Sequence, residues 1–380
     1  MTDQRLLPLI NDIKAKKLFA LMGEYETRFV GGCVRDALLN RPIGDMDMAT
    51  TATPQQVIST LSAQGVKTIP TGIDHGTVTA IIDGTGFEIT TLRKDVETDG
   101  RRAVVAFSQD WQEDALRRDF TINAMSLDAD GQLYDYFGGQ QDIHDQCMRF
   151  IGQADARIRE DYLRILRFFR FASVLNWDIA TNDDVQACIA LAPQLATLSR
   201  ERIQTELSKL LLGPGALRVV QVMAQHHILS SIIPSLDVTA FETLLAAEAT
   251  PDAFRRLLAL VGWQQDPDFI VLSREQKKIL QTLRQLQDSD WPIWKILYHY
   301  GQDMARHYHY LMGKNTSDLA VIDTWQQPVF PLKAEDVFHL TNGPGVAVGT
   351  TLKQAENYWL ERQFAPNQQE LLTFLVGRKG

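Results

Sequence analysis

Two aspartates, Asp45 and Asp47, are the residues whose type and spacing best suit catalysis. If their segment is a strand, both carboxylates leave it on one face, because side chains alternate along a strand. Gly31-Gly32 lies shortly upstream and predicts a tight turn that presents backbone N–H groups to phosphate. Paired carboxylates beside such a turn suit a divalent metal and a nucleoside triphosphate. The simpler interpretation of an isolated Asp-x-Asp pair is two exposed carboxylates at a strand end.

Further polar residues are spaced so that they join this pair. Residues 75–93 predict a β-hairpin, and its second strand carries Glu88 on the polar face, which makes Glu88 a candidate third carboxylate. Arg35 follows the glycines by one helical turn and is a candidate triphosphate ligand. Arg117-Arg118-Asp119 and Asn123 are candidates for holding ribose and phosphate. For each of these residues the alternative is a solvated or self-paired surface group.

A second cluster of charge lies on a predicted helix from Glu160 to Leu175. Asp161, Arg164, Arg167 and Arg170 recur every third residue, so they predict a slowly spiralling ridge. An aspartate accepts a hydrogen bond from the exocyclic amine of cytosine or adenine, and a neighbouring arginine donates to the ring atom beside that amine. Uracil and guanine present a carbonyl there and are repelled.

Asp161 and Arg164 are therefore candidates to select C and A without a nucleic-acid template. Arg167 and Arg170 continue the ridge and are candidates to bind phosphate or base. The alternative interpretation of the whole segment is an ordinary amphipathic helix with a basic face.

The sequence predicts both helices and strands up to about residue 140 and only helices after it, and these elements must position the candidate residues. Residues 6–24 predict an amphipathic helix, and residues 53–63 predict a helix that begins with a Thr cap and a Pro. Residues 94–106 are polar and charged and predict a mobile loop. Residues 112–128 predict a helix that carries the neighbouring arginines and ends in strand-like residues. After about residue 140 the β signals stop, so the sequence predicts an α+β protein.

The bulk properties are those of an ordinary globular protein. The chain has 380 residues, of which 45% are hydrophobic and 22% are charged, and it has room for two or three domains. It lacks an apolar run long enough for a membrane crossing and a recognisable secretory signal. Three widely spaced cysteines suit the reducing cytoplasm and offer no zinc spacing. A net charge of −9 argues against broad non-specific binding of nucleic acid.

Together these motifs resemble the family of class II tRNA nucleotidyltransferases, or CCA-adding enzymes, and bacterial poly(A) polymerases. The matches occur in family order over about residues 28–210. They are Gly31-Gly32 with Val34-Arg35-Asp36, Asp45 and Asp47 with Thr50, Glu88 to Arg93, Arg117 to Asn123, Asp135 with Gly138-Gly139 and Asp142, Glu160-Asp161 with Arg164, and Ser199 to Ile203 with Glu206.

This resemblance implies a polymerase-β-like nucleotidyltransferase palm, a mixed sheet with helices, at residues 1–142. Helical neck, body and tRNA-binding tail domains are then expected at 143–212, 213–330 and 331–380. The resemblance also implies that residues 94–106 form a flexible loop that helps the switch from C to A addition.

The resemblance further implies roles for individual residues. Asp45 and Asp47 would bind catalytic Mg²⁺, and Glu88 would complete the catalytic set. The residues implied to bind the nucleotide are Gly32, Arg35, Arg118, Asp161, Arg164, Arg167 and Arg170. Asp119 and Asn123 join them as the candidates for holding ribose and phosphate named above.

The implied activity is addition of C, C and A to the tRNA 3′ end from CTP and ATP, with release of pyrophosphate. The segment after Asp47, Ala49 to Pro54, resembles the tRNA branch and lacks the basic-hydrophobic segment of poly(A) polymerases. The expected partners are tRNA, CTP and ATP, with no protein partner and no membrane. A poly(A) polymerase, a partial CC- or A-adding enzyme and an inactive RNA-binding homologue remain the alternatives.

Overall fold

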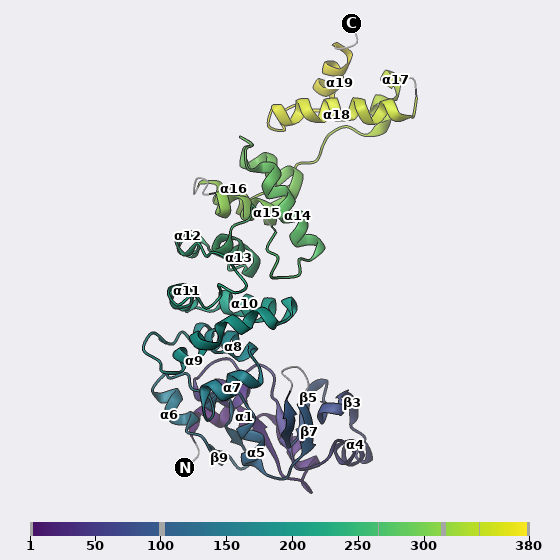
Figure 1. Ribbon diagram of the computed structural model, residues 1–380. Helices are drawn as coiled ribbons and strands as arrows, with labels where there is room; N and C mark the ends of the chain where they lie inside the picture. The colour runs from purple at the N-terminus through teal and green to yellow at the C-terminus, as the bar shows by residue number, and fades with distance from the viewer. Residues whose placement is uncertain (1–2, 99–102, 265, 313–316, 342, 378–380) are drawn as a thin grey trace. The chain divides into compact units, whose positions relative to one another are not determined.

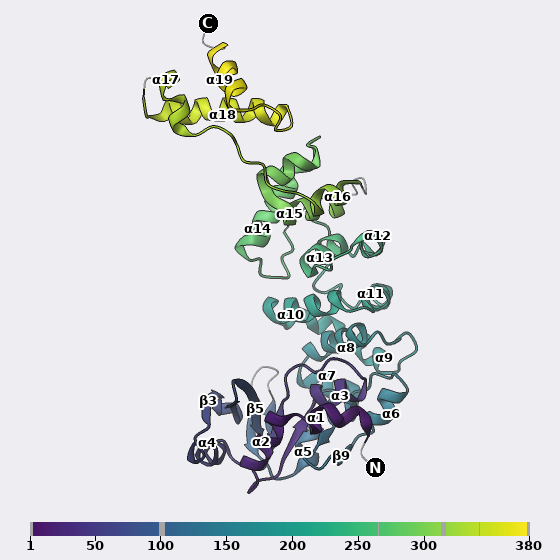
Figure 2. The same cartoon turned by 180° about the vertical axis from the view of Figure 1, so that it is seen from behind.

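The computed structural model describes residues 3–98, 103–264, 266–312, 317–341 and 343–377. The chain divides into two compact units. Unit 1 comprises Met1–Gly262 and Pro267–Val271, and unit 2 comprises Trp263–Asp266 and Leu272–Gly380. All strands of the described residues belong to unit 1, as Figures 1 and 2 show from two sides. None of the described helices combines the length and apolarity that a membrane crossing requires.

The elements of unit 1 begin with an α+β region and end with helices. Its strands are β1 (Thr27–Val30), β2 (Met48–Thr50), β3 (Lys67–Gly72), β4 (Thr77–Ile82), β5 (Thr85–Thr91), β6 (Arg93–Thr98), β7 (Ala103–Phe107), β8 (Ser126–Leu127) and β9 (Leu133–Tyr134). Its α-helices are α1 (Leu7–Ile10), α2 (Ile13–Leu21), α3 (Gly32–Leu38), α4 (Pro54–Ala63), α5 (Trp111–Leu116), α6 (Gly139–His144), α7 (Ala154–Glu160), α8 (Leu163–Leu175), α9 (Asp184–Leu191), α10 (Arg200–Leu212), α11 (Ala216–Gln225), α12 (Val238–Ala247) and α13 (Ala253–Val261). Short 3₁₀ helices are η1 (Gln4–Leu6), η2 (Ile73–His75), η3 (Thr121–Asn123) and η4 (Ala192–Thr197).

All elements of secondary structure in the described residues of unit 2 are helices. Its helices are α14 (Arg274–Leu286), α15 (Ile293–Met312, which contains a kink at Gly301), α16 (Ser317–Asp323), η5 (Ala334–Val337), α17 (Phe338–Thr341), α18 (Val346–Glu361) and α19 (Gln368–Gly377). A buried cluster that includes Val337, Trp359 and Leu371 packs α18 against α19 and the turn before α17. The predicted change from mixed to helical structure is confirmed, and so is the α+β class.

In the described part of unit 1, the larger sheet has the strand order β3-β4-β5-β2-β1-β8-β9. The strands β2 and β5 are parallel, whereas β1 is antiparallel to both β2 and β8. Alternation along β4 and β5 buries residues such as Val78, Phe87 and Ile89 and leaves Glu88 exposed, as a half-buried hairpin requires. Pairing of Met48 with Ile89 places the segment before β2 beside the strand that carries Glu88.

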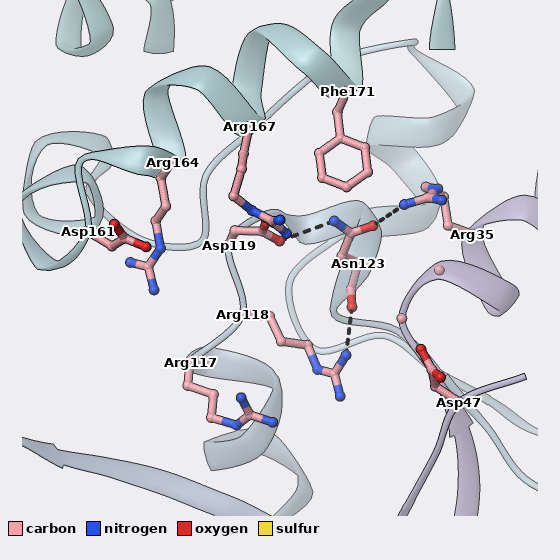
Figure 3. Close-up of a pocket in the computed structure, with 12 residues that line it drawn as sticks. Arg35, Asp47, Arg117, Arg118, Asp119, Asn123, Asp161, Arg164, Arg167 and Phe171 are labelled. Carbon is pink, nitrogen blue, oxygen red and sulfur yellow. Dashed lines mark hydrogen bonds and ion pairs between the residues drawn. The ribbon is translucent and has the colours of Figure 1, made fainter. Parts of the chain in front are cut away.

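The helical part of unit 1 is built on α8 and α10. Both helices keep apolar residues on their inner faces, and α8 contacts α7, α10 and α11. Phe168 of α8 stacks on Phe150, with ring centroids 5.5 Å apart, and Phe120 packs against both rings. Aromatic packing of this kind fixes α8 on the segments that carry Phe120 and Phe150. The side chains along α8 are thereby held over η3, which Figure 3 shows at close range.

Several local predictions are confirmed. Thr53 caps α4 in a capping box with Gln56, and Pro54 occupies the first turn. The hairpin of β4 and β5 turns at Asp83-Gly84, where both residues have positive φ.

Two predicted elements differ from the structure: one helix is broken, and one loop forms two strands. The expected helix over 6–24 is broken because Asp12 is extended and its carboxylate caps α2 by accepting from Ala15 N at 2.7 Å. The expected loop over 94–106 forms the antiparallel pair β6–β7, with Arg93 opposite Phe107 and Asp95 opposite Val105. Valines at 96, 104 and 105 favour strands, but the many polar residues of this segment led to the prediction of a loop. The middle of that segment, residues 99–102, lies outside the described residues, and its predicted mobility stays a prediction.

Two helix boundaries also differ from the sequence prediction. Helix α5 ends at Leu116, so Arg117 and Arg118 follow the helix instead of lying on it. The expected helix over 160–175 is interrupted at Asp161, which is extended. Its Oδ1 atom accepts from Leu163 N at 3.1 Å and so marks the start of α8. A short polar side chain competes with the helical backbone in this way. The prediction that Asp161 and the three arginines share one helix is therefore wrong, because Asp161 precedes α8.

Candidate active site

A pocket of about 420 Å³ in unit 1 gathers most of the predicted site residues. Its lining comes from the β1–α3 turn, the segment before β2, the segment after α5, and α8. The lining residues are Gly31, Gly32, Arg35, Asp47, Arg117, Arg118, Asp119, Asn123, Asp161, Arg164, Arg167 and Phe171. Five arginines face three aspartates among them, so the described lining carries an excess of positive charge that suits an anionic ligand.

The glycine turn forms one wall of this pocket. Gly31 has φ 72°, a conformation that residues with a side chain rarely adopt. A Cβ atom at Gly31 would also lie 2.9 Å from Nη1 of Arg118, so a glycine is needed for this close approach. The turn leads directly into α3, where Arg35 donates to Oδ1 of Asn123 at 2.6 Å and pairs with Asp36. The pairing with Asp36 that the sequence left as an alternative is therefore present, but it does not remove Arg35 from the pocket.

The three predicted carboxylates lie on or beside two central strands of the larger sheet, Asp45 and Asp47 just before β2 and Glu88 on β5. Asp47 lines the pocket, and its carbonyl oxygen accepts from Val30 N at 3.0 Å. Burial, and then the negative charges of Glu88 and Asp45, raise the pKa of Asp47 to about 6, although Arg118 opposes them. Asp45 and Glu88 therefore lie near enough to Asp47 to act on its charge, although neither belongs to the pocket lining. The expected strand at Asp45–Asp47 is wrong, because β2 begins only at Met48.

A divalent cation fits this donor set on chemical grounds. Carboxylate oxygens are the ligands that Mg²⁺ prefers, and a cation would relieve the repulsion that raises the pKa of Asp47. Among the described residues, no group of three or more His, Cys, Asp and Glu side chains is arranged to hold a metal by itself. Mg²⁺ commonly binds through one or two carboxylates together with substrate phosphates, which matches a pair such as Asp45 and Asp47.

The arginines that follow α5 point into the pocket from below in Figure 3. Asp114 holds both of them, with Nε of Arg117 at 2.8 Å from Oδ1 and Nη2 of Arg118 at 3.1 Å from Oδ2. Nη1 of Arg118 also donates to the carbonyl oxygen of Asn123 at 3.4 Å. The sequence reasoning missed Asp114, although acidic and basic residues spaced by three and four are a recognisable helical signal.

Asp119 organises the centre of the pocket. Its Oδ1 atom accepts from Asn123 Nδ2 at 3.1 Å and from Phe120 N at 2.9 Å, and its Oδ2 atom accepts from Nε of Arg167 at 2.8 Å. Burial alone would raise the pKa of Asp119, but the Arg167 charge and these hydrogen bonds lower it overall. Asp119 therefore stays ionised and fixes Arg167 and Asn123.

The predicted base-selecting pair lies on the opposite side of the pocket from Asp47, as Figure 3 shows. The backbone N of Arg164 donates to the carbonyl oxygen of Asp161 at 3.0 Å, but the two side chains have other partners. Nη2 of Arg202, from α10, donates to Oδ2 of Asp161 at 2.6 Å. Arg164 instead donates to Glu160 at 2.6 Å and to the carbonyl oxygen of Arg157 at 2.7 Å. Each member of the pair is thus oriented by its own partner.

Arg170 is the predicted nucleotide-binding residue on α8 that the structure does not bring into the pocket lining. Its guanidinium pairs with Glu206 of α10 and lies 3.9 Å from the ring centroid of Phe171. Burial lowers the pKa of Arg170, although Glu206 opposes that effect. Arg167 also approaches Glu206, at 3.6 Å, so this buried carboxylate positions the inner face of α8.

Comparisons with known proteins agree with this architecture. Residues 27–149 match the family described as poly A polymerase head domain, and residues 182–239 match the one described as probable RNA and SrmB-binding site of polymerase A. The mitochondrial CCA tRNA nucleotidyltransferase 1 of Danio rerio is 34% identical over 379 residues, covering 93% of this chain and 87% of that protein. The CCA-adding enzyme of Streptococcus suis is 32% identical, with 98% and 96% of the two chains covered.

A solved structure supports the same assignment. The Bacillus stearothermophilus CCA-adding enzyme in complex with CTP has a TM-score of 0.72 and 28% identity, and the match covers 99% of this chain and 98% of the other. The resemblance that the sequence motifs indicated is thereby confirmed. The chain belongs to the family of class II CCA-adding tRNA nucleotidyltransferases and poly(A) polymerases.

Proposed function

We propose that this chain is a CCA-adding enzyme, which adds C, C and A to the 3′ end of tRNA from CTP and ATP. The observation that carries the proposal is the union, in one pocket, of an arginine cluster with the Asp161 and Arg164 pair. The arginines suit a triphosphate, and the pair suits the amine edge of C or A. Relatives that match this chain over most of its length carry the same activity in their names.

In the proposed reaction, the 3′ hydroxyl oxygen of tRNA attacks the α-phosphorus of the bound CTP or ATP. A new phosphodiester bond forms, the bond from the α-phosphorus to the bridging oxygen breaks, and pyrophosphate leaves. Arg35 and Arg118 hold the triphosphate, and Asp119 keeps Arg167 and Asn123 in place beside it. Positioning and charge stabilisation of this kind supply most of the rate in phosphoryl transfer.

Asp45 and Asp47 are the residues that would hold Mg²⁺, with Glu88 as the neighbouring third carboxylate. When bound, the metal would activate the attacking hydroxyl and stabilise the charge of the departing pyrophosphate.

The remaining assignments follow from this proposal. Residues 1–142 act as the catalytic head, and the neck, body and tail at 143–212, 213–330 and 331–380 carry the tRNA acceptor end. The three cysteines are unpaired, which fits a reducing compartment, and we propose the cytoplasm.

The test is to incubate a tRNA that ends before CCA with CTP and ATP, separately and together, in the presence of Mg²⁺. CTP alone should add two residues, ATP alone should add none, and both together should add a single CCA. Long A tails would identify a poly(A) polymerase, and products that stop at CC would identify a partial enzyme. Binding of tRNA without any incorporation would identify an inactive homologue.

A further inference from the structure

The carboxylate of Asp114 lies outside the pocket lining but contacts two of the residues that form it. Its side chain is only 4% exposed, so water does not replace these contacts. Oδ1 accepts from Nε of Arg117 at 2.8 Å, and Oδ2 accepts from Nη2 of Arg118 at 3.1 Å. A single buried carboxylate therefore fixes the two neighbouring arginines, each through its own oxygen atom.

The charge of Asp114 is maintained by these partners. Burial would raise the pKa of Asp114, but the charges of Arg118 and Arg117 lower it overall. Arg118 in turn lies against the turn at Gly31 and donates to the carbonyl oxygen of Asn123. The orientation of Arg118 therefore depends on Asp114 at one end of its guanidinium and on Asn123 at the other.

The same carboxylate also contacts the beginning of the β6–β7 hairpin. Oδ1 of Asp114 accepts from the backbone N of Arg93, where β6 starts, at 3.3 Å. Its neighbour Glu113 accepts from Ser108 Oγ at 2.6 Å and lies 3.5 Å from Nζ of Lys94. Both ends of the hairpin are thus bonded to α5, one turn before the arginines of the pocket.

We propose that Asp114 is a positioning residue that aims Arg117 and Arg118 into the nucleotide pocket and links their placement to the β6–β7 hairpin. The proposal rests on the proposed function in one respect, namely that the ligand of the pocket is a nucleoside triphosphate. Asp114 contacts no reacting atom itself, because it acts through the two arginines.

The test compares Asp114→Asn with Asp110→Asn in the full chain. Asp110 caps the same helix by accepting from Gln112 N and Glu113 N, but it contacts neither arginine. Removing the charge from Asp114 should raise the Kd and the KM for CTP and ATP about tenfold, with a smaller change in kcat. The Asp110 variant should change these constants less than about twofold, because asparagine still caps the helix and position 110 contacts neither arginine. An unchanged Kd for CTP in Asp114→Asn would overturn the proposal.

A second experiment separates positioning from a structural effect. In a chain that already carries Arg117→Ala and Arg118→Ala, Asp114→Asn should leave the Kd for CTP unchanged, because no arginine remains to be positioned. A further tenfold rise in that background would show that Asp114 acts by another route. Glu113→Gln, which loosens both hairpin ends and keeps Asp114, should raise the KM about threefold. An unchanged KM there would remove the hairpin from the proposal.

These measurements are distinguishable from a failure of the proposed function. A parent chain that binds CTP but adds nothing to tRNA contradicts CCA addition, while the comparison of Kd values still tests Asp114. If the parent chain adds CCA, and Asp114→Asn binds CTP with the same Kd as the parent, only the positioning role is contradicted.

Discussion

Nη2 of Arg202 donates to Oδ2 of Asp161 across 2.6 Å, while the other carboxylate oxygen accepts from Leu163 N at 3.1 Å. Both oxygens of the predicted base-selecting carboxylate are therefore oriented before a nucleotide binds. The arginine comes from α10, 41 residues away in the chain, so the orientation of this carboxylate depends on how α10 packs on α8.

Loss of the Asp161 carboxylate should relax base choice. We expect Asp161→Ala to reduce the preference for CTP over UTP, measured as the ratio of kcat/KM values, by about tenfold to a hundredfold. Triphosphate affinity should fall less, because the arginines that we propose to hold the phosphates lie elsewhere in the pocket. An unchanged preference would rule out the selecting role.

Loss of Arg202 should also reduce the preference for CTP over UTP, but less than loss of the Asp161 carboxylate. In Arg202→Ala, the Asp161 carboxylate keeps its bond to Leu163 but loses its second anchor. We expect the preference for CTP over UTP to fall about threefold to tenfold, with kcat for CTP reduced less. A loss of kcat with full base preference would indicate that Arg202 serves the packing of α10 only. Lys209→Ala, in the last turn of the same helix, provides the control.

Removal of either metal-binding carboxylate should stop nucleotide addition. We expect Asp45→Asn and Asp47→Asn to lower kcat about a thousandfold or more, because the metal supplies several kcal/mol of charge stabilisation. The control is Asp83→Asn, an exposed aspartate in the hairpin turn that pairs with Lys17. The measurement is single-turnover incorporation of CMP at saturating CTP, and wild-type rates in either site variant would contradict the assignment.

A methyl group at Gly213 should disturb the packing of α8 on α10. A Cβ atom there would lie 2.2 Å from Ser173 Oγ and 2.6 Å from the backbone carbonyl carbon of Ser173, which cannot move away easily. We expect Gly213→Ala to destabilise the fold by about 1–3 kcal/mol, measured by urea unfolding. Gly44→Ala, where nothing lies within 4 Å of the added atom, should change stability by much less. Equal stabilities in the two variants would contradict the close approach.

Acid should weaken the fold through Asp119. Although burial opposes the shift, Arg167 lowers the pKa of Asp119 in the folded chain below its ordinary value of 3.8. The stabilisation that follows from this shift is complete above the unfolded pKa of about 4 and is lost as the pH falls through the lower folded pKa. Asp119→Asn should therefore be less stable than the parent at pH 7, and the difference should shrink below about pH 4. Urea unfolding from pH 7 to pH 3 would measure this, and a constant difference would contradict it.

Part of the local structure was readable from the sequence, where neighbouring residues decide the outcome. Thr53-Pro54 placed the start of α4, and the turn at Asp83-Gly84 placed the β4–β5 hairpin. Capping and turn conformations involve residues that are adjacent in sequence, so their energetics do not depend on the rest of the fold. The order of motifs also determined the family, which the comparisons confirm.

Only the tertiary structure decided which partner each charged group has. Asp119 pairs with Arg167 across 48 residues, and Asp161 pairs with Arg202 instead of the neighbouring Arg164. The raised pKa of Asp47 likewise depends first on its burial and then on Glu88, which the parallel pairing of β2 with β5 brings near. A charged side chain on a short segment can reach several partners at similar cost. Burial selects among them, because an unpaired charge inside the protein is far more costly than one in water.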